Sequence, residues 1–174
     1  MTKRGRPSLI LGCSPREHPS LLDYVSFIPF VAVVVAIAAS GAIFRPGEWY
    51  QSLDKPSWTP PSWLFGPAWS VLYLMIAIAG WLVWKQAGMS GALAFWIVNL
   101  AANGAWSWLM FGRRQMTLAL VDALLMLVTI VGFIRFAWPI SETAAWLFVP
   151  YLAWVSFASA LNLSLLLRNR PARF

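Results

Sequence analysis

The chain is poor in the residues from which proteins build disulfides and metal centres. Its 174 residues include one cysteine, Cys13, and one histidine, His18. A single cysteine excludes an internal disulfide and a cysteine-based metal site, and one histidine leaves too few ligands for a histidine-based site. We therefore predict no metal site and no required cofactor.

Charged residues are also scarce, at 11% of the chain, whereas soluble domains carry about 25%. The net charge is nevertheless +7. In a soluble protein this excess of positive charge would suggest nucleic-acid binding. However, no stretch outside the apolar runs mixes basic residues with aromatic residues that could stack on bases. Basic residues beside membrane spans contact lipid headgroups. We predict a lipid bilayer as partner and no nucleic-acid binding.

Hydrophobic residues make up 60% of the chain and gather in runs of about 20 residues, the length that crosses a bilayer. A β-barrel is disfavoured because its short strands would alternate apolar with polar residues. We predict an all-α membrane protein in which residues 21–168 form a bundle of five transmembrane helices. The predicted spans are about 21–44, 66–84, 89–111, 116–136 and 144–167.

Polar tails are predicted at both ends of this bundle. Residues 1–20 are interpreted as a basic, flexible N-terminal tail, and residues 169–174 as a basic C-terminal tail. Leu9–Cys13 loosely resembles a lipoprotein cleavage site. The apolar run before Cys13 is too short for a signal peptide, which needs about 7–15 apolar residues.

The connection between the first two spans, "WYQSLDKPSWTPPSWLFGPAW" at residues 49–69, is rich in tryptophan and proline. Prolines restrict their own backbone and that of the preceding residue, so the segment should be stiff. Ordered loops of this length are often lids or binding loops. We interpret it as a structured lid, and the alternative is a belt of aromatic residues at the membrane interface.

Amides and large rings recur at helical spacing inside the spans. Asn99, Asn103 and Trp106 share one face of the third span. Converging rings with a few polar groups would line a small-molecule pocket, and the alternative is that Asn103 and Asn162 simply hold helices together. The other pocket candidates on the second and fifth spans are Trp69, Tyr73, Trp154, Phe157 and Ala158.

Asp122 is the one ionisable residue deep within a predicted span, and such residues are functional candidates. The alternatives are a structural pair with Arg113 or Arg114, or a hydrogen bond to a neighbouring helix. Small residues in the third span, such as Ala101 and Ala105, would allow close helix approach. We predict a homodimer formed through that span.

Several motifs together indicate a family. "EWYQSLDKPSWTPPSWLFGPAWSVLY", "FGRRQM", "ALVDALL" and "VPYLAWVSFASALN" resemble the translocator protein family, also called tryptophan-rich sensory proteins or peripheral-type benzodiazepine receptors. The resemblance covers about residues 25–168. It implies a five-helix bundle, commonly dimeric, that binds porphyrins such as haem and protoporphyrin IX, and also sterols and isoquinoline carboxamide drugs.

The resemblance also assigns roles to residues. Trp69 and Trp154 match a pair implicated in photo-oxidative porphyrin degradation, and they are the candidate catalytic residues. Tyr50 matches a lid tyrosine, Asn103 a pocket polar group, and Ala158 a small residue whose substitution alters ligand binding. The complete predicted ligand-binding set is Tyr50, Trp58, Trp63, Trp69, Tyr73, Asn103, Trp106, Trp154, Phe157 and Ala158.

From these observations we predict a porphyrin-binding membrane sensor or carrier of tetrapyrroles that can promote their photo-oxidative degradation. The chain has no nucleophile–base pair or paired carboxylates, so it is not a conventional enzyme. The alternative is a lipid- or sterol-binding structural or regulatory protein, although Leu163 and Ser164 depart from the sterol pattern of animal members. We expect the bacterial cell envelope rather than the mitochondrial outer membrane.

Overall fold

The computed structural model describes residues 21–169, and within them every regular element is helical. The predicted tails, residues 1–20 and 170–174, lie outside the described residues. The elements in chain order are α1 (Leu21–Ile43), α2 (Glu48–Gln51), α3 (Ser62–Ala87), α4 (Gly91–Ser107), the π-helical turn η1 (Trp108–Gly112), α5 (Met116–Ala137) and α6 (Glu142–Arg168).

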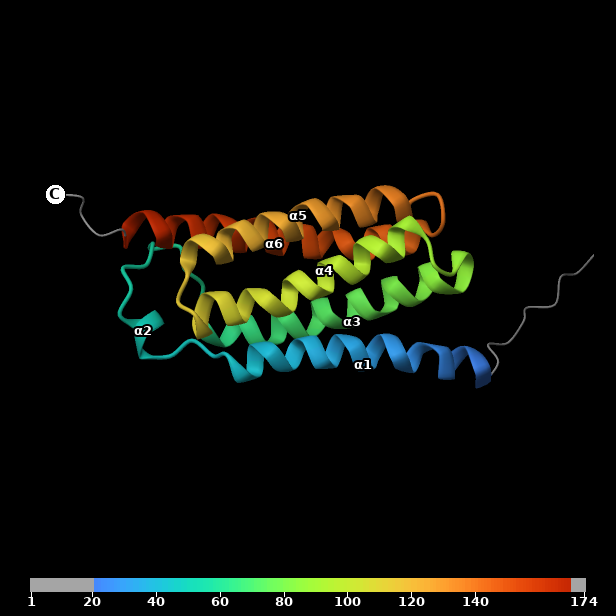
Figure 1. The fold of residues 1–174 in the computed structure, drawn as a ribbon, viewed down its shortest axis with the longest axis horizontal. Coiled ribbons are helices and arrows are strands. Elements are labelled where there is room, and N and C mark those ends of the chain that lie inside the picture. The colour runs from blue at the N-terminus through green and yellow to red at the C-terminus, as the bar shows by residue number, and fades with distance from the viewer. Residues whose placement is uncertain (1–20, 170–174) are drawn as a thin grey trace, which may run out of the picture.

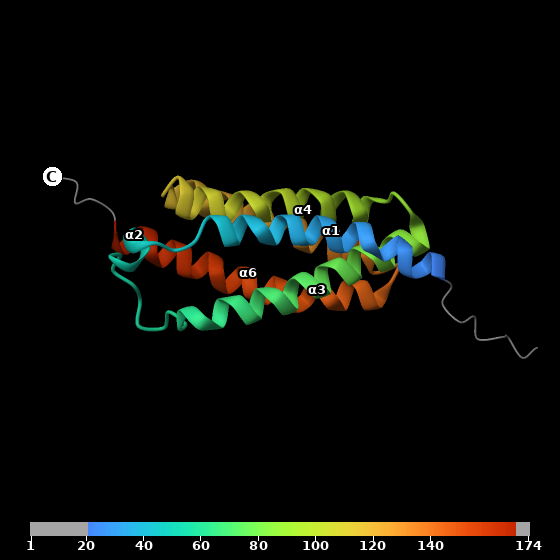
Figure 2. The ribbon, with the colours of Figure 1, turned by 90° about the horizontal axis from the view of Figure 1, so that it is seen from below.

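The long helices run roughly along one axis and pack in a closed ring (Figures 1 and 2). Helix α1 packs on α3, α3 on α6, α6 on α5, α5 on α4, and α4 on α1. Two short connections turn the chain at one end, between α3 and α4 and between α5 and α6. The 44–61 loop, which contains α2, lies at the other end together with the η1–α5 turn and the end of α6 (Figure 1).

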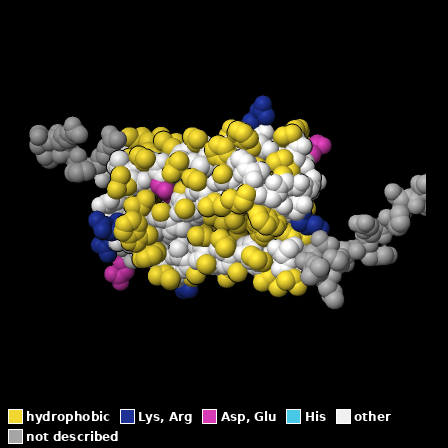
Figure 3. All heavy atoms as spheres, turned by 45° about the vertical axis from the view of Figure 1, so that its right-hand side comes forward, with side chains coloured by type: hydrophobic (Ala, Val, Ile, Leu, Met, Phe, Trp, Pro, Cys, Tyr) yellow, Lys and Arg dark blue, Asp and Glu magenta, His cyan; other side chains and the backbone are white. Residues whose placement is uncertain are grey.

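Length and composition make this an integral membrane protein. Among residues 21–169, the helices long and apolar enough to cross a bilayer number four: α1, from Val25, α3, α5 and α6. Helix α4 has 17 residues before the backbone changes to the wider π-helical turn, so the prediction of five spans stays a prediction. Hydrophobic side chains cover much of the face seen in Figure 3, as expected where lipid replaces water.

Local sequence explains where the helices begin and end. The Ser90 and Ser141 hydroxyls accept hydrogen bonds from the backbone N–H groups of Leu93 and Ala144, capping α4 and α6. Gly88 has φ of 57°, a left-handed conformation that glycine adopts without strain, and its N–H closes the last turn of α3 on the Trp84 carbonyl.

Helix α3 begins earlier than the predicted span of 66–84. Pro61 is extended, with φ of −57° and ψ of 140°, and precedes the first helical residue, Ser62. Pro67 lies inside α3, where it loses one backbone hydrogen bond without ending the helix. As a result Trp63, which the sequence places in the loop, stands in the first turn of α3.

The centre of the bundle is tightly packed. Phe133 and Phe148 stack with ring centroids 3.8 Å apart. Gly80 permits a close approach, because a Cβ atom there would lie 2.5 Å from the indole of Trp96. The Trp96 Nε1–H donates to the Ile76 carbonyl at 2.9 Å, so this buried ring is fixed by packing and by a hydrogen bond.

Candidate functional site

Trp69 lies at the centre of an aromatic cluster formed by α3 and α6. Trp69 and Tyr73 are one turn apart on α3 and stack, with centroids 5.2 Å apart and planes at 30°. The Trp154 ring lies 6.4 Å from Trp69 at 84°, and the Tyr151 ring lies 6.2 Å away at 67°. The fold therefore brings together the two tryptophans that the sequence predicts as a pair.

Asn103 on α4 connects the two tyrosines of this cluster. The Tyr73 hydroxyl donates to Asn103 Oδ1 at 2.9 Å, and Asn103 Nδ2 donates to the Tyr151 hydroxyl at 2.9 Å. One amide thus joins α3, α4 and α6 and holds the rings on either side of Trp69. Tyr151 is fully buried and was missed in the sequence, although it stands one turn before Trp154.

Other amides hold neighbouring helices together. Asn99 Nδ2 donates to the Thr129 hydroxyl on α5 at 2.9 Å. In the amide orientation that satisfies both polar atoms, Asn162 donates to the Met116 carbonyl at 3.1 Å and accepts from the Leu120 N–H at 3.2 Å. Asn103 and Asn162 thus bond between helices, as the structural interpretation predicted, and Asn99 does so as well. A direct ligand contact by Asn103 stays a prediction.

Asp122 does not form the structural ion pair considered from the sequence. Within residues 21–169 the ion pair joins Arg168 to Asp54 instead. The Oδ2 atom of Asp122 is buried and has no hydrogen-bond partner.

Trp154 has a polar atom that the protein leaves unused. Its ring packs against Phe65 at 5.8 Å and Phe157 at 6.0 Å. The Nε1–H is buried but has no acceptor, and a buried donor without a partner costs about 1–3 kcal/mol. Ala158, one turn further along α6, is half-buried.

The 44–61 loop reaches this cluster through Trp58. The Trp58 ring meets Phe157 edge to face at 5.7 Å, so a chain of rings runs from the loop through Phe157 and Trp154 to Trp69. Trp63, in contrast, is 71% exposed and faces the surroundings rather than the cluster. Its part in ligand binding stays a prediction.

Tyr50 belongs to a second aromatic group at the same end of the bundle. The Tyr50 and Trp106 rings each meet Phe111 edge to face, at 5.4 and 5.6 Å. The Lys55 ammonium lies 5.0 Å from the centre of the Tyr50 ring. Burial raises the pKa of the Tyr50 hydroxyl above its usual value, so this side chain stays neutral and can donate a hydrogen bond.

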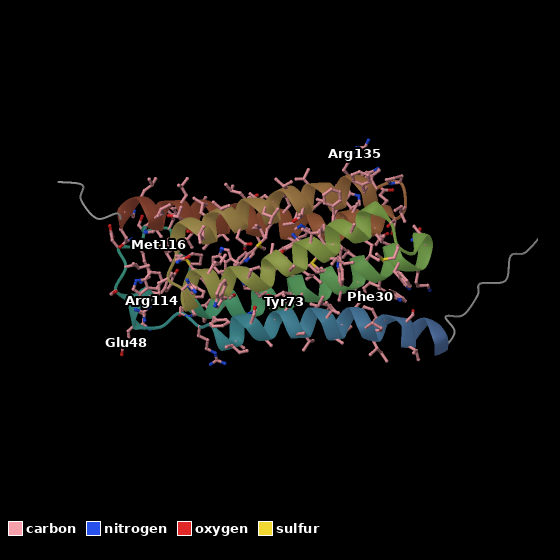
Figure 4. The ribbon with its side chains drawn as sticks, in the orientation of Figure 1. Phe30, Glu48, Tyr73, Arg114, Met116 and Arg135 are labelled. Carbon is pink, nitrogen blue, oxygen red and sulfur yellow. The ribbon has the colours of Figure 1, made fainter. Side chains whose placement is uncertain are left out.

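Basic side chains gather around this end of the bundle. The Arg113 guanidinium lies 5.4 Å from the Trp108 ring, and that of Arg114 lies 6.0 Å from the Trp49 ring. Figure 4 shows Arg114 and Glu48 at the loop end, Arg135 at the opposite end, and Tyr73 between them. Lys55 and Arg168 also belong to the loop end, which is therefore suited to the negative groups of a ligand or of lipid.

An apolar groove of about 620 Å³ lies elsewhere, between α1 and α4. Phe30, Trp84, Trp96 and Ile97 line it, and no predicted ligand-binding residue does. Within residues 21–169, no three His, Cys, Asp or Glu side chains gather in a way that could hold a metal ion.

The fold and the cluster define a class of protein: an integral membrane bundle of helices with an indole- and tyrosine-lined site in the half next to an aromatic loop. Comparison with known proteins gives the family. The profile of the TspO/MBR family matches residues 30–168. The chain belongs to this family, as its motifs predict.

Individual relatives come from bacteria and from animals. The tryptophan-rich sensory protein of Cereibacter sphaeroides is 37% identical over 141 residues, covering 81% of this chain and 89% of that protein. Protein CrtK of Rhodobacter capsulatus is 39% identical, covering 78% of this chain and 86% of that protein. The human translocator protein is 41% identical over 130 residues, covering 70% and 77%. The bacterial location therefore stays a prediction.

Proposed function

We propose that this protein binds a tetrapyrrole, of the protoporphyrin IX or haem type, at the Trp69–Trp154 cluster and acts as a sensor or carrier of it. The observation that carries the proposal is the buried Trp154 Nε1–H without an acceptor, in a site walled by aromatic rings. A porphyrin has flat apolar faces for the rings and carboxylate oxygens that accept hydrogen bonds from an N–H.

The charge at the loop end agrees with such a ligand. The carboxylates of a porphyrin suit the basic side chains at the loop end, of which Lys55 and Arg114 lie next to aromatic rings. Each ring stacked on the macrocycle would contribute about 0.5–1.5 kcal/mol beyond the burial of its area. The name of the Cereibacter relative, a sensory protein rich in tryptophan, fits the same role.

The cluster side chains are in mutual contact, so a macrocycle enters only when rings or the 44–61 loop move apart. The loop is linked to Trp154 through Phe157, which contacts Trp58 at 5.7 Å and Trp154 at 6.0 Å. Opening at the Trp58–Phe157 contact would expose the Trp154 Nε1–H to a ligand arriving from the loop end.

The test is a titration of the detergent-purified protein with protoporphyrin IX in the dark. Binding is monitored by the quenching of tryptophan emission. We compare the native chain with the double variant Trp69→Phe, Trp154→Phe. The matched control is Trp146→Phe, because Trp146 is 56% exposed and lies on the first turns of α6 at the far end. We expect saturable quenching in the native chain and the control, and a dissociation constant raised about tenfold by loss of the N–H and of indole area in the double variant.

Quenching that rises linearly and equally in all three proteins would mean that porphyrin only dissolves in the micelle. That result would refute the proposal and favour the alternative of a lipid-binding structural or regulatory protein.

Light-dependent breakdown of the bound porphyrin is the second candidate, favoured by two indoles 6.4 Å apart. The single variants Trp69→Phe and Trp154→Phe separate the two functions under illumination. If a variant still binds porphyrin but the porphyrin absorbance no longer falls under light, the indole takes part in the chemistry. If both fall together, the indoles are walls of the site.

A further inference from the structure

The middle of the 44–61 loop is joined to the end of α6 by a reciprocal pair of hydrogen bonds. The Asp54 backbone N–H donates to Asn169 Oδ1 at 2.9 Å, and Asn169 Nδ2 donates to the Asp54 carbonyl at 3.0 Å. A side-chain amide thus pairs with a loop residue as a second backbone strand would. These two residues are 115 positions apart, so the pair is a tertiary connection.

Asn169 is itself held firmly in position. Its Nδ2 also donates to the Leu165 carbonyl at 2.9 Å, and its backbone N–H donates to the same carbonyl at 3.0 Å. Both Nδ2 hydrogens and Oδ1 are therefore in use. The Arg168–Asp54 ion pair beside them measures 3.4 Å, with the two side chains 46% and 63% exposed, and such a pair contributes little.

The loop beyond Asp54 is stiff enough to transmit this connection. The Thr59 N–H and hydroxyl both bond to the Pro56 carbonyl, at 3.0 and 2.7 Å, and Pro56 is buried. Trp58 lies within this turn and contacts Phe157. Movement at Asp54 therefore carries Trp58 with it.

We propose that Asn169 and the Asp54 backbone form a latch that holds the 44–61 loop closed over the aromatic cluster and sets how often it opens. The proposal that Asn169 holds the loop closed rests on these contacts alone. Control of ligand entry rests in addition on the proposed function.

Asn169→Asp is the sharpest perturbation, because it keeps the shape and one acceptor oxygen. It removes both Nδ2 hydrogens and places a carboxylate beside the carbonyl oxygens of Asp54 and Leu165. Arg168→Gln is the matched control, since it removes only the exposed ion pair. We measure hydrogen–deuterium exchange of the ligand-free protein in nanodiscs, which reports local opening.

We expect exchange over residues 52–59 to rise roughly tenfold in Asn169→Asp, the effect of losing one to two hydrogen bonds of ordinary strength. It should change by less than about twofold in Arg168→Gln, and amides in the last turns of α6 should keep their protection in both variants. Unchanged loop exchange in Asn169→Asp would overturn the latch. An equal rise in the last turn of α6 would also overturn it, because fraying of the helix would then explain the result.

Stopped-flow mixing with protoporphyrin IX tests the control of ligand entry. An open loop should raise the association and dissociation rates together, by a factor similar to the rise in exchange. Faster exchange with unchanged porphyrin rates would refute control of entry. Absence of saturable porphyrin binding in the native chain would instead refute the proposed function, while the exchange result decides the latch separately.

Discussion

Replacement of Asn103 by leucine tests whether a single amide positions the candidate site. Leucine has the same number and branching of heavy side-chain atoms as asparagine, so the change removes the polar atoms and keeps the branching, although its methyl groups are bulkier. The Tyr73 hydroxyl loses its acceptor, and the buried Tyr151 hydroxyl loses its donor, each at 2.9 Å. Hydrogen bonds between membrane helices contribute about 0.6 kcal/mol on average and about 1.7 kcal/mol at most.

Two such bonds give an expected loss of about 1–3 kcal/mol in the free energy of unfolding. The upper part of this range applies if the Tyr151 hydroxyl, which is fully buried, finds no new partner. The assay is unfolding in mixed micelles by increasing sodium dodecyl sulfate, followed by circular dichroism. Because Trp69 stacks on Tyr73 at 5.2 Å, the variant should also shift the tryptophan emission spectrum.

A double-mutant cycle identifies the cause. Tyr73→Phe should lower the free energy of unfolding in the native chain and have almost no effect in the Asn103→Leu background, because its partner is already absent. Equal costs in both backgrounds, or a cost of Asn103→Leu below about 0.5 kcal/mol, would show that the amide does not hold the rings in place.

Three further predictions concern stability and use the same unfolding assay. Gly80→Ala should destabilise the protein by about 1–3 kcal/mol, because the new Cβ overlaps the Trp96 ring. The control Gly41→Ala, whose Cβ would stand 3.6 Å from its nearest neighbour, should be neutral or stabilising. Similar costs for both variants would contradict the packing argument. Asp122→Asn should raise the free energy of unfolding by on the order of 1 kcal/mol, because a buried carboxylate oxygen without a partner costs more than an amide. A less stable variant would mean that the acid has a partner in the membrane. Ser141→Ala should cost about 0.5–2 kcal/mol through loss of the α6 N-cap, and an unchanged midpoint would show that water replaces the cap.

The aromatic loop shows where interpretation of the sequence was limited. Its prolines predict a stiff segment, which stays a prediction. Pro56 is buried, and the Thr59 hydroxyl donates to its carbonyl. The partner of the loop could not be predicted, because Asn169 is an ordinary polar residue in a terminal segment interpreted as a basic tail. Only the packing of α6 beside the loop makes its amide the group that meets Asp54.

In the candidate site, too, the sequence predicted neighbours on one helix but not contacts between helices. Helical spacing placed Trp69 with Tyr73, and Asn99 with Asn103, because residues three or four apart share a face of a helix. Spacing could not show that Trp69 meets Trp154 or that Asn103 bonds to tyrosines on two other helices. It also could not show that Trp63 faces outward, because Pro67 permits a helix that begins before it.

The sequence by itself determined the class and family of this protein, since long apolar runs must form helices in a bilayer and the loop motif is specific. The tertiary structure alone decided which polar atoms are used. Asn103 and Asn169 bond across helices and loop, whereas the Trp154 Nε1–H and Asp122 Oδ2 have no partner. The physical reason is that a hydrogen bond depends on distances of about 3 Å between groups far apart in the chain, and only the packing of the helices sets those distances.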